Sequence, residues 1–183
     1  MSAVPVLPPG GGPIRPPGSP ARVRAVSTVA VSIDIAAPVQ VVWDFAMDPR
    51  STLEWVTIAR GLGAVDDGPL RVGFEMEQTL ALRGVPFKVA WTLVAIDAPH
   101  FARWEGHGPA RSRAVIEDRL SARDGGTHFH YTNSFRAPFG PLGLVASRAV
   151  VGGIPEHEAV ASLERLKRRL EGAHSGDVAA AAG

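Results

Sequence analysis

The sequence predicts an α+β domain in which an antiparallel sheet covers one face of a long C-terminal helix. Three observations carry this prediction. Apolar and polar residues alternate through several stretches between Ser27 and Arg136, as expected for strands with one buried face. Four of these stretches pair into two hairpins whose apolar faces coincide. A stripe of apolar residues at helical spacing follows, and no other element is long enough to cover the sheet.

The first predicted strand spans residues 27–35 and is followed by two short helices. Pro38 opens the first helix, because proline's missing N–H costs nothing in a first turn. Val41, Val42 and Phe45 are expected to share its buried face, and an Asp-Pro break follows Met47. Trp55 ends the second helix. We expect Trp55 to pack in the core beside a solvated Glu54, with a gate as the alternative.

The two hairpins predict the register of the sheet. A two-residue loop at Arg83 and Gly84 places Leu82 opposite Val85, and the same register brings Met76 opposite Trp91. In the second hairpin, a turn at residues 124–126 pairs even positions of 112–122 with odd positions of 129–135, again apolar face to apolar face. A strand at 101–106 lies between them and turns Trp104 inward, while residues 56–65 form a weaker strand.

The final helix is predicted from about residue 141 to residue 171. Its apolar stripe consists of Ala159, Leu163, Leu166 and Leu170. Gly152, Gly153 and Pro155 interrupt the helix, since proline in a helix interior costs ~3 kcal/mol. We expect a bend there.

The chain is predicted to hold one domain, at residues 25–172. Residues 1–24 form a Pro/Gly-rich arm that cannot bury enough apolar surface to fold, and residues 173–183 form a flexible tail.

Composition narrows the function. The chain has 19 Lys and Arg against 18 Asp and Glu, a net charge of +1, so nucleic acid is not an expected partner. It has no cysteine, which excludes disulfides and thiolate chemistry.

The sequence offers one possible pair of metal ligands, His128 and His130, which form an H-x-H on an outward face. Two ligands are too few to hold a metal ion. No apolar run reaches the ~18 residues of a membrane span. We expect a cytoplasmic protein without metal, cofactor or stable membrane insertion, as a monomer or homodimer.

Three segments carry a resemblance to a known family: IDIAAPVQVVWDFAMDPRSTLEW near the start, GGTHFHYTNSF running into PFGPLG, and ASLERLKRRLEG at the end. Together they resemble the START-like (SRPBCC) superfamily, in its polyketide cyclase/dehydratase branch. The resemblance covers about residues 27–171. It implies a helix-grip fold, in which a curved sheet of six to seven antiparallel strands wraps around the C-terminal helix and leaves an elongated cavity for hydrophobic ligands.

The inward faces of the predicted strands supply the candidate site. Asp118 is the candidate catalytic acid or base, because desolvation would raise its pKa. The alternative is a carboxylate hydrogen-bonded to Asn133 or to backbone. Gln78 is equally a ligand contact or a satisfied core amide. The residues expected to bind ligand are Phe74, Met76, Gln78, Phe87, Trp91, Trp104, Tyr131 and Asn133.

Two functions remain open at this point. The first is an aromatase, cyclase or dehydratase that folds a polyketide-like substrate in the cavity and moves protons with one or two polar groups. The second is a noncatalytic carrier or sensor of a lipid or another hydrophobic ligand. The inward faces hold no histidine or lysine, which favours binding, whereas the resemblance favours catalysis. A chaperone-binding domain with the same fold is a third reading, to be preferred if the cavity is filled.

Overall fold

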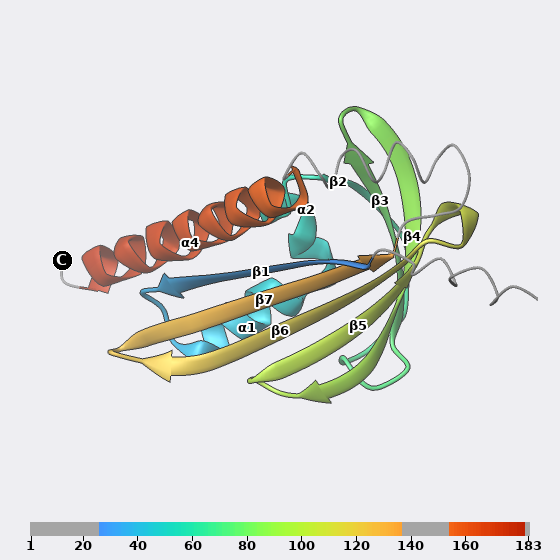
Figure 1. Cartoon of the computed structure of the whole chain (residues 1–183). Helices are drawn as coiled ribbons and strands as arrows, with labels where there is room; N and C mark the ends of the chain where they lie inside the picture. Colours follow the sequence, from blue (N-terminus) through green and yellow to red (C-terminus); the bar gives the residue numbers. More distant parts are fainter. Residues whose placement is uncertain (1–25, 137–153, 182–183) are drawn as a thin grey trace, which may run out of the picture.

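The computed structural model describes residues 26–136 and 154–181, and its centre is one curved antiparallel sheet of seven strands (Figure 1). The strand order is β1-β7-β6-β5-β4-β3-β2. The strands are β1 Val26–Ile35, β2 Ala59–Val65, β3 Glu75–Leu82, β4 Val85–Asp97, β5 Phe101–His107, β6 Arg113–Arg123 and β7 Gly126–Arg136. The predicted α+β helix-grip fold is therefore confirmed.

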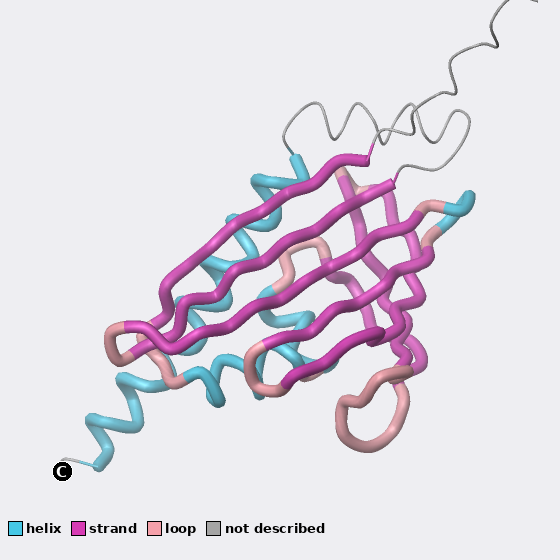
Figure 2. Tube along the Cα trace, turned by 60° about the horizontal axis from the view of Figure 1, so that its bottom comes forward, coloured by secondary structure: helices cyan, strands magenta, loops and turns pink. Residues whose placement is uncertain are grey.

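Helices lie on the concave side of this sheet (Figures 1 and 2). Helix α1, Val39–Met47, the 3₁₀ turn η1, Pro49–Ser51, and helix α2, Thr52–Trp55, connect β1 to β2. The C-terminal helix α4, Ile154–Ala181, runs along β1 and packs against α2. Pro155 falls in the first turn of α4, where proline is tolerated. The predicted helical stretch 141–153, with Gly152 and Gly153, lies outside the described residues.

The hairpin registers match the predicted ones. Leu82 pairs with Val85 and Met76 with Trp91 across β3 and β4. Asp118 of β6 pairs with Tyr131 of β7. Because side chains alternate along each strand, these registers bring the apolar residues of all four strands to the concave face.

Three sequence predictions need correction. Val72 alternates with Phe74 and Met76, a pattern that predicts a strand from Arg71 with Val72 on its buried face. Val72 is instead 64% exposed, because Gly73 adopts a φ of +87° and β3 begins only at Glu75. Val41 is 44% exposed. The buried residues of α1 are instead Val42, Trp43, Ala46 and Met47. Val42 and Ala46 lie one helical turn apart, as do Trp43 and Met47, so the four share one face. The helix α4 also continues past Glu171, the predicted end of the helix, through an alanine-rich stretch of high helix propensity.

The core forms where α1 and α4 meet the sheet. Phe129 and Leu93 are fully buried, as are Leu163 and Leu166 of the predicted stripe on α4. Trp55 is 7% exposed, as expected for a core residue. These side chains form one cluster, so α4 is held to the sheet mainly by apolar burial.

Polar contacts set the position of α4 along the sheet. The backbone N–H of Ala36 donates to Glu171 Oε1 at 2.8 Å, and Arg169 Nε donates to Glu54 Oε2 at 2.9 Å. Two turns nearer the start of the helix, the Thr57 N–H donates to Ser162 Oγ at 3.0 Å. These bonds connect α4 to a residue before α1, to α2 itself and to a residue after α2.

Substituting Gly126 by Ala is expected to destabilise the protein by about 1–3 kcal/mol. Gly126 starts β7, and a Cβ there would lie 2.4 Å from the carbonyl oxygen of Ile35, so the backbone must shift. Gly172→Ala in α4 is the control: nothing lies within 4 Å of its Cβ position, and alanine should stabilise the helix by ~1 kcal/mol. Urea unfolding measures both, and equal midpoints for Gly126→Ala and the natural protein would contradict the contact.

Candidate functional site

Asp118 lies on the concave face, on β6, the third strand in the order of the sheet. Its neighbours across the sheet are Ala102 of β5 and Tyr131 of β7. The residue is only 4% exposed, and its carboxyl group forms no hydrogen bond with the described residues. Burial without a partner raises the pKa of Asp118 to about 7. The group can therefore give up or accept a proton near neutral pH.

Tyr131 and Asn133 lie beside Asp118 on β7. Asn133 Nδ2 donates to the Tyr131 hydroxyl oxygen at 3.1 Å, so the predicted alternative partner of Asp118 is engaged elsewhere. Burial, and then the charge of Asp118, raise the pKa of Tyr131 above its usual range, so the phenol stays protonated. Asn133 Oδ1 is buried and has no hydrogen-bond partner among the described residues.

Two predicted tryptophans also face this interior. Trp91 is 4% exposed, and its ring covers Gly106 on the neighbouring strand β5, where a Cβ would come within 2.5 Å of the indole. Its Nε1 is buried without a partner in the described part of the chain. Trp104 packs edge-on against Phe74, with ring centroids 6.2 Å apart at an interplanar angle of 85°. Gly106 is thus the residue that permits Trp91 to lie flat on the sheet.

Gln78 is held by a structural contact. Its Nε2 donates to Thr52 Oγ1 at 3.0 Å, and Thr52 Oγ1 donates to the carbonyl oxygen of Pro49 at 2.6 Å. The Gln78 amide therefore connects β3 to η1 and α2.

The concave face has inward-facing side chains that are only partly buried. Among the predicted ligand contacts, these are Met76 and Phe87. Inward-facing apolar residues of β1 and β6 are also partly exposed, namely Val29, Val31, Ile33 and Ile116. The concave face is not completely filled.

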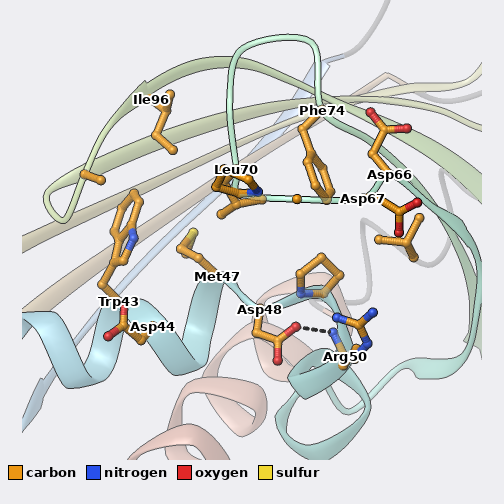
Figure 3. Close-up of a pocket in the computed structure, with 15 residues that line it drawn as sticks. Trp43, Asp44, Met47, Asp48, Arg50, Asp66, Asp67, Leu70, Phe74 and Ile96 are labelled. Carbon is orange, nitrogen blue, oxygen red and sulfur yellow. Dashed lines mark hydrogen bonds between the residues drawn. The ribbon is translucent and has the colours of Figure 1, made fainter.

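A separate pocket of about 420 Å³ lies at one end of the domain, where α1 and η1 face the loop between β2 and β3 (Figure 3). Its apolar lining includes Trp43, Met47, Leu70, Phe74 and Ile96. Its charged lining residues are four aspartates and one arginine, namely Asp44, Asp48, Asp66, Asp67 and Arg50. Asp48 Oδ1 accepts a hydrogen bond from the Arg50 N–H at 2.9 Å.

Of the predicted site residues, only Phe74 lines this pocket. Since Phe74 also contacts Trp104, it lies between the pocket and the concave face. The other lining residues from the β2–β3 loop were not predicted, because a loop has no periodicity from which side-chain direction can be inferred.

The two histidines of the H-x-H lie on the outward face of β7. His128 Nδ1 is 2.6 Å from Asp34 Oδ1, and His130 Nδ1 is 2.7 Å from Ser32 Oγ. The hydrogen bond from His128 lowers the pKa of Asp34. Within residues 26–136 and 154–181, no three His, Cys, Asp or Glu side chains come together in a way that could hold a metal ion.

A curved antiparallel sheet that covers a C-terminal helix, with short helices after the first strand, is the helix-grip arrangement expected of the START-like superfamily. The family model described as polyketide cyclase / dehydrase and lipid transport matches residues 27–171. The chain therefore belongs to this family, which confirms the resemblance to the START-like superfamily.

Related sequences occur in Mycobacterium tuberculosis. An uncharacterized protein is 26% identical over 131 residues, covering 70% of this chain and 92% of that protein. A protein named as a toxin is 24% identical over 127 residues, covering 68% of this chain and 88% of that protein.

Solved structures share the fold. The Zhui aromatase/cyclase from a Streptomyces species has a TM-score of 0.68 at 15% identity, over 80% of this chain and 94% of that chain. A protein from Thermus thermophilus has a TM-score of 0.67 at 16% identity, over 80% and 98% of the two chains. None of the helices in the described part of this chain has the length and apolar character needed to cross a membrane.

Proposed function

We propose that this protein binds a hydrophobic small molecule, polyketide- or lipid-like, against the concave face of the sheet, and catalyses its cyclisation or dehydration with Asp118 as acid and base. The observation that carries the proposal is the unpartnered Asp118 carboxyl group, buried on an otherwise largely apolar face. Buried polar groups are normally hydrogen-bonded, so an unpartnered one among apolar side chains suits a ligand. The family description and the aromatase/cyclase neighbour support the same class of ligand.

A single carboxyl group is sufficient for a dehydration. In a β-hydroxy ketone, the Asp118 carboxylate takes the proton from the carbon next to the carbonyl. The electrons of that C–H bond form the new C=C bond as the C–O bond breaks. Asp118, now protonated, gives its proton to the departing hydroxyl, which leaves as water. A pKa of about 7 suits both steps, because proton transfer is most effective when the catalytic pKa is close to the working pH.

The alternative is a noncatalytic carrier or sensor. One observation favours it: Asp118 and Tyr131 are the only ionisable side chains on the inward strand faces that the structure describes, and the raised pKa of Tyr131 keeps it protonated. A carrier needs no second catalytic group. Turnover of a bound ligand separates the two functions.

The test begins with native mass spectrometry of protein purified from its own host, which identifies the chemical class of a retained ligand. Turnover of that ligand, or of a β-hydroxy ketone of the same class, is then measured for Asp118→Asn. General acid–base catalysis is worth about 10²–10⁴-fold, so we expect a loss of that size in kcat with affinity nearly unchanged.

Asp97→Asn is the matched control, because Asp97 is an exposed aspartate at the end of β4. Full activity of Asp118→Asn would exclude Asp118 as the acid and base. Ligand binding without turnover by the natural protein would establish the carrier. If no ligand binds at all, the proposal fails in favour of a protein-binding domain.

A further inference from the structure

Two inward-facing hydrogen-bonding groups have opposite character and no partner among the described residues. The Trp91 Nε1–H is a donor, and Asn133 Oδ1 is an acceptor. Both atoms are buried, and Trp91 as a whole is 4% exposed. Because neither group can be satisfied by the described protein, a ligand that meets both must offer an acceptor to Trp91 and a donor to Asn133.

The two groups face a common stretch of the sheet. Trp91 pairs with Gly106 of β5, and Gly106 pairs with Ala114 of β6. Asn133 of β7 pairs with Ile116, two residues farther along β6. Since the indole ring covers Gly106, it extends from β4 over β5. In the cross-strand row of Trp91, the residues between β4 and β7 are thus the small Gly106 and Ala114.

The charges of the same faces indicate what the ligand lacks. The inward positions of β1 and β3–β7 carry no lysine, arginine or histidine in the described structure. The basic side chains of these strands are on the outer face, where some form ion pairs, as in Lys88–Glu77 and Arg103–Glu117. A ligand carboxylate would have no cation to pair with and would face Asp118, so burying it would be costly.

We propose, building on the function above, that Trp91 and Asn133 select an uncharged ligand, with an acceptor oxygen on Trp91 Nε1 and a hydroxyl group donating to Asn133 Oδ1, and that the site rejects long-chain carboxylates. A hydroxy-substituted ketone meets these requirements. A free fatty acid does not.

The test uses two matched pairs of probes in equilibrium dialysis at pH 6.5. Flavone carries a ketone and a ring ether oxygen but no hydrogen-bond donor, and 7-hydroxyflavone adds a hydroxyl group. Oleyl alcohol and oleate differ in the charged head group. We expect 7-hydroxyflavone to bind more tightly than flavone, and oleyl alcohol about tenfold more tightly than oleate, the size of effect that one orienting polar interaction gives.

Two variants assign the contacts. Trp91→Phe should lower the affinity for both flavone and 7-hydroxyflavone about tenfold, because both carry the ketone. Asn133→Leu should lower the affinity for 7-hydroxyflavone to that for flavone and leave flavone unchanged. Trp43→Phe, the same substitution on α1, should change neither affinity. Circular dichroism and thermal unfolding show that each variant is folded.

The outcomes separate this inference from the proposed function. If the probes bind but Trp91→Phe and Asn133→Leu leave the affinities as they are, the selection is wrong while the proposed function stands. Oleate binding as tightly as oleyl alcohol would also overturn the selection. If none of the four probes binds and no ligand is retained from the host, the proposed function fails, and this inference with it.

Discussion

Replacing Asp118 by Asn should raise the free energy of unfolding by about 4 kcal/mol above pH 7, and by little near pH 4. Burial raises the pKa of Asp118 from 3.8 to about 7 in the folded protein, so the folded state holds the proton more tightly than the unfolded state. Each unit of difference is worth ~1.4 kcal/mol. The ionised carboxyl group therefore destabilises the fold progressively as the pH rises from about 4 to 7, and the cost is then constant.

The measurement is urea unfolding of the natural protein and the variant at several pH values between 4 and 8. Only the difference between the two proteins is informative, since other groups titrate equally in both. Asp97→Asn, at an exposed position, should show no such pH-dependent difference. A difference between Asp118→Asn and the natural protein that stays constant with pH would show that the pKa of Asp118 is the same in the folded and unfolded states, so that Asp118 is not the buried, proton-exchanging group we propose.

Replacing Phe74 by Ala should destabilise the protein by about 3–5 kcal/mol, the usual cost of truncating a buried aromatic side chain. Phe74 is 2% exposed, lines the pocket of Figure 3 and packs edge-on against Trp104. Its removal takes away the ring between that pocket and the concave face. We therefore also expect ligands of the concave face to associate faster with the variant.

Val72→Ala is the control for this truncation, because Val72 lies two residues away and is 64% exposed. It should change stability by less than about 0.5 kcal/mol. Thermal unfolding gives the stability of each variant, and stopped-flow tryptophan fluorescence gives the association rate. A loss for Phe74→Ala no larger than that for Val72→Ala would mean that Phe74 is not packed as the structure describes.

The register of the sheet could be predicted from the sequence because two local constraints agree. The turn at Arg83 and Gly84 allows a two-residue loop, and that loop brings the apolar residues of β3 and β4 to one side. The same agreement holds between β6 and β7, which is why Asp118, Tyr131 and Asn133 could be predicted to lie side by side. The stripe at Leu163, Leu166 and Leu170 likewise predicted the buried face of α4.

Local pattern failed where the backbone departs from regular structure. Gly73, with its positive φ, ends the alternation before β3, so Val72 is exposed while Phe74 still turns inward. On α1, Val41 is as apolar as Val42, and only the placement of the helix against the sheet exposes one and buries the other. No pattern within a single element could have distinguished them.

The sequence by itself determined the class of fold, the strand registers and the set of polar residues that face inward, because these depend on periodicity and turn chemistry within short segments. Only the tertiary structure decided what each inward polar group does. Gln78 is held by Thr52, twenty-six positions away in the chain, whereas Asp118 and Trp91 Nε1 have no partner among the described residues. Hydrogen-bond satisfaction and desolvation depend on contacts between distant segments, and those contacts separate an amide that has a partner from buried groups that have none in the described structure.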